Sequence, residues 1–217
     1  MEKIYLFGGL GVDKPVFEYI HFKNFDKKVI NWIEPEKDES LEGYCKRLLP
    51  QIESENPVLA GVSFGGIVAQ KISELIKVKQ VFLISSVRSY REIPWFIRIA
   101  GTLRLNKIVP LGALRKMNRL IRWFFMTKDP KYKQLIQNII KDTSPTYMKW
   151  AVNTLLAWRG DYKTENIIQI HGDMDRTFPI RNIRKPDYII NGAGHFMVVQ
   201  NAEEIGGIID SRAFKGK

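Results

Sequence analysis

Gly61-Val62-Ser63-Phe64-Gly65 lies between an apolar run, residues 57–60, and a helical pattern, residues 67–72. This arrangement predicts a serine on a tight turn that joins a strand to a helix. Such a turn pushes the hydroxyl out of the fold and leaves no room for side chains at the flanking positions, which glycine occupies. We therefore expect Ser63 at the carboxyl end of a strand, with its hydroxyl accessible.

Short apolar stretches alternate with helical patterns along the rest of the chain. Strands are expected at residues 3–7, 28–33, 57–62, 80–84, 167–170 and 188–190, and helices at residues 41–52 (with Ser40 as N-cap), 67–76 and 203–209. Strands that are apolar on both faces and alternate with helices are typical of a parallel sheet covered on both sides. The predicted fold class is α/β, with a mostly parallel sheet of about six strands and a helical insertion.

Length and composition are those of one soluble globular domain: 217 residues, 45% hydrophobic and 26% charged. No apolar run approaches the roughly 20 residues of a membrane-spanning helix. Residues 4–7 are too short for the core of a signal peptide. The single Cys45 permits no internal disulfide and no cysteine-based metal site. A cytoplasmic location is the expectation.

The positive charge is concentrated in one region. Residues 88–128 contain ten Lys or Arg and one acid, Glu92, and so carry +9 of the net +11. The spacing of apolar residues predicts helices throughout residues 88–160. They are expected at 94–103 (with Trp95, Phe96, Ile99 and Leu103 inward), at 115–126, around 135–140 as a shorter helix, and at 147–158 with Pro145 in a first turn.

Ser63 needs a base before its hydroxyl becomes a nucleophile. His195, in Gly192-Ala193-Gly194-His195-Phe196, follows the last predicted strand and is the candidate. The other two histidines are interpreted as structural. His21 precedes an aromatic-rich connection, and His171 ends a strand.

An acid behind the imidazole would fix its tautomer and stabilise the imidazolium formed during reaction. Asp175, in the run His171-Gly172-Asp173-Met174-Asp175, is favoured, and Asp173 is its competitor. Either residue could instead be a turn aspartate that bonds to nearby backbone amides.

Gly8-Gly9-Leu10-Gly11 follows the first predicted strand. Its backbone N–H groups could stabilise a developing oxyanion together with the amide of Phe64. Each such donor is worth roughly 3 kcal/mol of activation barrier. A phosphate site is disfavoured, because the loop lacks the lysine of a phosphate-binding loop and the spacing of a dinucleotide fingerprint.

The chain order Ser63, Asp175, His195, with Gly-x-Ser-x-Gly around the serine, resembles the α/β-hydrolase superfamily. Gly172-x-x-Asp175 and Gly192-x-Gly194-His195 are similar to that family's acid and base loops. The resemblance covers residues 1–87 and 166–210. It implies one α/β-hydrolase domain over residues 1–217, with a core at 1–87 and 161–217 and a helical cap at 88–160. It also implies a serine hydrolase that uses no metal or organic cofactor.

Two features depart from the family pattern. Phe7 precedes Gly8 where the family often has histidine, which leaves open whether Gly9 or Leu10 donates to the oxyanion. The first strand corresponds to the family's third, so a six-stranded sheet with a more exposed edge is expected.

The expected activity is cleavage of an ester or thioester of a small or medium acyl group. The basic cap has three interpretations: a solvated cap, a surface that attracts anionic substrates such as acyl-coenzyme A, or a weak contact with an anionic membrane surface. Nucleic acid is not an expected partner, because no binding motif accompanies the charge. The alternatives are a weakly active or inactive ligand-binding protein on the same scaffold, or a lyase, C–C hydrolase or haloperoxidase.

Overall fold

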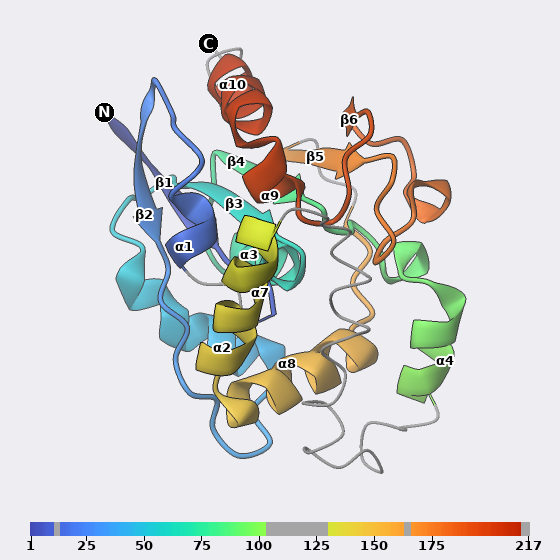
Figure 1. The fold of residues 1–217 in the computed structure, drawn as a ribbon. Helices are drawn as coiled ribbons and strands as arrows, with labels where there is room; N and C mark the ends of the chain where they lie inside the picture. The colour runs from blue at the N-terminus through green and yellow to red at the C-terminus, as the bar shows by residue number, and fades with distance from the viewer. Residues whose placement is uncertain (11–13, 103–129, 163–165, 214–217) are drawn as a thin grey trace.

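The computed structural model describes residues 1–10, 14–102, 130–162 and 166–213, and its centre is a six-stranded sheet (Figure 1). The strands are β1 (Glu2–Phe7), β2 (Phe25–Val29), β3 (Val58–Val62), β4 (Gln80–Ile84), β5 (Ile167–Gly172) and β6 (Tyr188–Ile190). They lie in the order β2-β1-β3-β4-β5-β6, and every neighbouring pair is parallel. The predicted α/β class with a parallel sheet of six strands is confirmed.

Helices cover both faces of the sheet. They are α1 (Lys14–Phe17), α2 (Leu41–Leu48), α3 (Phe64–Leu75), α4 (Trp95–Thr102), α7 (Pro130–Asp142), α8 (Pro145–Ala157), α9 (Met197–Gln200) and α10 (Ala202–Ala213). Alternate residues of β1 face opposite layers: Ile4 and Leu6 pack with α1, α9 and α10, while Tyr5 and Phe7 pack with α2 and α3. No helix in the described part of the chain is long and apolar enough to cross a membrane.

The second strand differs from its prediction. It spans Phe25–Val29 rather than residues 28–33 and pairs in register with β1, from Glu2 opposite Phe25 to Leu6 opposite Val29. Lys27 and Lys28 are tolerated because β2 is an edge strand, and these charges hide it from a hydrophobicity pattern. Ile33 leaves the sheet, and its backbone N–H and C=O both bond to the Tyr44 hydroxyl instead.

The described part of the 88–160 segment contains α4, α7 and α8. The predicted inward orientation of α4 is wrong: Trp95, Phe96 and Ile99 are 65%, 49% and 47% exposed. The helix packs on α8 and contacts the core through Ile97 instead. The expected helix at 135–140 is longer than predicted, since α7 has 13 residues, as many as α8. Leu103 and the predicted helix at 115–126 lie outside the described residues.

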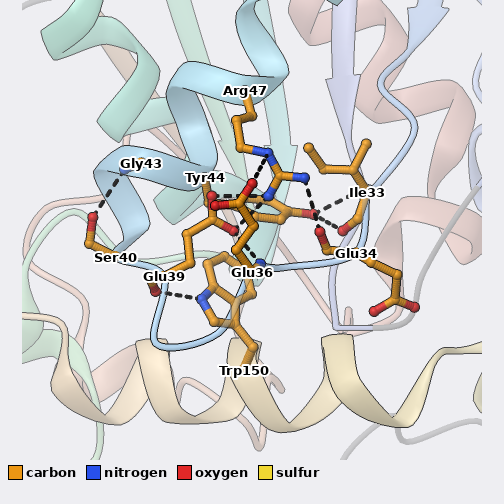
Figure 2. A network of polar contacts seen from close by, with 9 residues as sticks. All are labelled: Ile33, Glu34, Glu36, Glu39, Ser40, Gly43, Tyr44, Arg47 and Trp150. Atoms are coloured by element: carbon orange, nitrogen blue, oxygen red, sulfur yellow. Dashed lines mark hydrogen bonds and ion pairs between the residues drawn. The ribbon is translucent and has the colours of Figure 1, made fainter.

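Helix α8 is attached to α2 and to the loop that precedes it (Figure 2). The Trp150 indole Nε1 donates to the Glu39 carbonyl oxygen at 2.8 Å. Arg47 holds the Glu39 side chain through two bonds of 2.8 and 3.0 Å. The Tyr44 ring lies 4.1 Å from the Trp150 ring, centroid to centroid. These contacts fix α8 relative to the face of the sheet that carries α3.

Candidate active site

The parallel sheet brings four loops to one edge. Because all six strands point the same way, the loops that leave β1, β3, β5 and β6 emerge together at their carboxyl ends. These loops carry Gly9, Ser63, Asp175 and His195, respectively. Residues far apart in the chain therefore meet at this edge.

Ser63 occupies the turn between β3 and α3 with φ 52° and ψ −118°. A side chain other than glycine rarely adopts a positive φ, and the strain costs on the order of 1–3 kcal/mol. The turn is also crowded. A Cβ on Gly61 would lie 2.3 Å from the Gly65 oxygen, and a Cβ on Gly65 would lie 2.2 Å from the Gly8 oxygen. The glycines at both positions are therefore required by close backbone approach, as the sequence suggested.

Ser86 stabilises this strained turn, and no sequence motif marks it beyond its place as a polar residue after a strand. Its hydroxyl donates to the Ser63 carbonyl oxygen at 2.6 Å. The Ser63 N–H donates to the Ile84 oxygen at 3.0 Å, which extends the β3–β4 pairing to the turn. Ser63 is thereby held from β4 while its own side chain stays partly exposed.

Ser63, His195 and Asp175 form a continuous chain of hydrogen bonds. His195 Nε2 lies 3.0 Å from Ser63 Oγ, and His195 Nδ1 lies 2.7 Å from Asp175 Oδ2. A carboxylate only accepts, so Nδ1 carries the hydrogen and Nε2 presents its lone pair to the serine hydroxyl. The side chains of His195 and Asp175 are 4% and 0% exposed. This geometry can move a proton from Ser63 to His195.

Asp175 is held as a carboxylate. Its other oxygen, Oδ1, accepts from the backbone N–H groups of Thr177 at 2.7 Å and Phe178 at 2.9 Å. Burial by itself raises the pKa of Asp175, but the charge and hydrogen bond of His195, with smaller contributions from His171 and the Phe178 amide, hold that pKa below its usual value. The acid is therefore ionised at neutral pH.

The competitor, Asp173, has a different position. Its Oδ1 accepts from the Gly192 N–H at 2.7 Å and so ties the acid loop to the loop that carries His195. Asp175, and not Asp173, has the contact with the imidazole. Of the other side chains, His21 is exposed on the surface, and Cys45 is a buried thiol whose pKa burial raises to about 12.

The glycine-rich loop begins against the start of α3, since the Phe7 and Gly8 carbonyl groups are the nearest atoms to a Cβ placed on Gly65; Gly11 lies outside the described residues. Phe64 is the first residue of α3, and the first N–H groups of a helix have no partner within it. Oxyanion donation by Phe64 with Gly9 or Leu10 stays a prediction.

No group of three or more His, Cys, Asp or Glu that could hold a metal ion occurs among the described residues.

The sheet order and the site edge define the class: this chain has the α/β-hydrolase fold, and the resemblance seen in the sequence is confirmed at that level. Solved structures share this fold. It is similar to an esterase from Exiguobacterium antarcticum, with 16% identity, coverage of 98% of this chain and 92% of the other, and a TM-score of 0.72. A hydrolase from Oleispira antarctica is 14% identical, with coverage of 100% and 92% and a TM-score of 0.72.

A bromoperoxidase from Bacillus anthracis is also similar, at 17% identity, with coverage of 96% and 91% and a TM-score of 0.68. No protein-family model matches the chain, and no curated protein matches it in sequence. At these identities the likeness concerns the fold, so the activity has to be argued from the site.

Proposed function

We propose that the protein is a serine hydrolase that cleaves an ester or thioester of a small or medium acyl group. Ser63 Oγ attacks the acyl carbonyl while His195 Nε2 takes the hydroxyl proton. His195 then gives that proton to the departing alcohol or thiol, which leaves an acyl-enzyme on Ser63. A water molecule, deprotonated by His195, attacks the acyl-enzyme and releases the acid.

One observation carries the proposal: the unbroken pair of hydrogen bonds, 3.0 and 2.7 Å long, from Ser63 through His195 to Asp175. Asp175 stabilises the imidazolium that forms when His195 accepts the proton. The amides of Phe64 and of Gly9 or Leu10 would stabilise the oxyanion. The fold shared with an esterase and a hydrolase supports the same chemistry.

Turnover of p-nitrophenyl esters of increasing acyl length is the test. The wild-type protein should release p-nitrophenol, and Ser63→Ala should lower kcat by about 10⁴-fold or more. A folded wild-type protein that cleaves none of these esters, or a Ser63→Ala variant of equal activity, contradicts the proposal. A binding protein on this scaffold would instead keep its ligand affinity in Ser63→Ala without turnover by either form.

We further propose that residues 88–160 form a cap beside the site. Trp150 of α8 lies 5.9 Å, centroid to centroid, from the ring of Phe64, the residue after Ser63. The +9 charge of residues 88–128 suits an anionic substrate such as acyl-coenzyme A. Activity on acyl-coenzyme A should then fall with added salt more steeply than activity on a neutral ester of the same acyl group. Equal salt dependence refutes the electrostatic part.

The same charge could instead contact an anionic membrane surface, with no effect on substrate choice. Binding to vesicles that contain phosphatidylglycerol, but not to vesicles of phosphatidylcholine alone, supports that contact.

The likeness to a bromoperoxidase favours one other chemistry. The test is bromination of a phenol by bromide and hydrogen peroxide in the presence of acetate. Hydrogen peroxide in place of water would attack the acyl-enzyme on Ser63 and release a peracid, which oxidises bromide, and the activity should be lost in Ser63→Ala.

A further inference from the structure

His171 is a buried imidazole directly beside the acid of the proposed triad. It belongs to β5, is 0% exposed, and its Nε2 lies 2.7 Å from the Phe178 carbonyl oxygen. The same nitrogen is 3.5 Å from Asp175 Oδ2, the oxygen that bonds to His195. A carbonyl oxygen only accepts, so Nε2 carries the hydrogen. Nδ1 is buried without a hydrogen-bond partner in the described part of the chain.

Phe178 connects the His171 imidazole to both Asp175 and His195. Its N–H donates to Asp175 Oδ1 at 2.9 Å, and its carbonyl oxygen accepts from His171. Its ring meets the His195 imidazole edge-on, with centroids 5.6 Å apart and planes at 70°. A shift of Phe178 would therefore displace Asp175 and His195 together.

We propose that His171 is a positioning residue, which holds Phe178 and through it aligns Asp175 and His195 toward Ser63. The inference rests on the proposed function of the triad. The His171 side chain itself does not touch the reacting atoms. This positioning role also explains why a polar histidine stands in a fully buried strand, where an apolar residue would pack without needing a hydrogen-bond partner.

The role requires an uncharged imidazole. Burial lowers the pKa of His171, and the neighbouring His195 lowers it further, while Asp175, the Phe178 carbonyl and Glu92 act in the opposite direction. A second proton would sit on the buried Nδ1, where no acceptor is described. A charged His171 would also compete with His195 for the carboxylate of Asp175. The neutral form leaves that charge available to His195.

Two variants separate positioning from packing. In His171→Gln, the amide nitrogen can replace Nε2 and donate to the Phe178 carbonyl oxygen. In His171→Met, a side chain of similar length fills the space but cannot donate. With a p-nitrophenyl ester that the wild type cleaves, we expect His171→Met to lower kcat about 10- to 100-fold with little change in KM, and His171→Gln to stay near wild type.

A proton NMR measurement gives a readout that does not depend on turnover. The hydrogen between His195 Nδ1 and Asp175 Oδ2 should give a far-downfield resonance in the wild type and in His171→Gln, and the resonance should be lost in His171→Met. A folded His171→Met variant that keeps both the resonance and kcat overturns the inference. So does a His171→Gln variant as impaired as His171→Met.

Nitrogen-15 NMR of the wild type keeps the inference testable if His171→Met does not fold. His171 should be neutral and carry its hydrogen on Nε2 at about pH 7. A charged imidazole, or a hydrogen on Nδ1, overturns the inference. If the wild type cleaves no ester, the proposed function fails, while both NMR measurements still decide how His171 acts on Phe178 and His195.

Discussion

Alanine at position 65 would force the loop after β1 away from the start of α3. The new Cβ would lie 2.2 Å from the Gly8 oxygen and 2.3 Å from the Phe7 oxygen, whereas ordinary contacts begin at 3.4 Å. The two backbones must therefore separate by about 1 Å, and a displacement of that size near reacting groups costs about 100-fold in rate. Overpacking of this kind also lowers the free energy of unfolding by about 1–3 kcal/mol.

The assay combines kcat on a p-nitrophenyl ester with urea unfolding. Gly207→Ala is the matched control. Nothing lies within 4 Å of its added Cβ, and Gly207 is in the helix α10. This control should keep full activity and gain up to about 1 kcal/mol of stability from helix propensity. If Gly65→Ala retains wild-type kcat and stability, the close packing of the glycine-rich loop after β1 on the turn at Ser63 is refuted.

Three further changes have defined outcomes. Asp175→Asn should lower kcat by about 10³- to 10⁴-fold by favouring the wrong tautomer of His195, while Asp173→Asn should cost much less; equal losses would contradict the assignment of the acid. Burial lowers the pKa of His171 in the folded protein, so below the ordinary histidine pKa of 6.5 the unfolded chain binds a proton that the folded protein does not. The free energy of unfolding should therefore fall by up to about 2 kcal/mol between about pH 7 and pH 5. This loss should be absent in His171→Gln, and identical pH profiles of the two proteins would refute it. Trp150→Phe removes the bond to the Glu39 oxygen and should lower stability by about 1 kcal/mol in urea unfolding, and no change would show that this bond does not fasten α8.

The sequence predicted two of the apolar strands well because an uninterrupted run of apolar residues marks each of them. Gln80–Ile84 and Tyr188–Ile190 have the predicted bounds. The predicted bounds of the edge strand Phe25–Val29 are wrong, since charged residues interrupt its apolar pattern. The more apolar stretch that follows lies outside the sheet, where the Tyr44 hydroxyl bonds to the backbone of Ile33. The exposed face of α4 was also misassigned, because helical periodicity identifies an apolar face but not what covers it.

The motifs named the residues that meet at the site, but not the contacts that hold them. Ser63, Asp175 and His195 could be chosen from chain order and glycine spacing, and the structure brings them within hydrogen-bond distance. In sequence, Ser86 and His171 are polar residues at strand ends with no motif that includes them. Ser86 bonds to the backbone oxygen of Ser63, and His171 bonds to the backbone oxygen of Phe178. Both contacts form only in the folded chain, and no local sequence pattern encodes them.

Covalent labelling tests the central claim most directly. The protein, folded and at neutral pH, should react with a fluorophosphonate, and mass spectrometry of the digested protein should place the adduct on Ser63. Ser63→Ala should remain unlabelled, and His195→Ala should react far more slowly. An adduct on another residue, or a folded wild-type protein that forms none, would contradict the account that His195 and Asp175 activate Ser63.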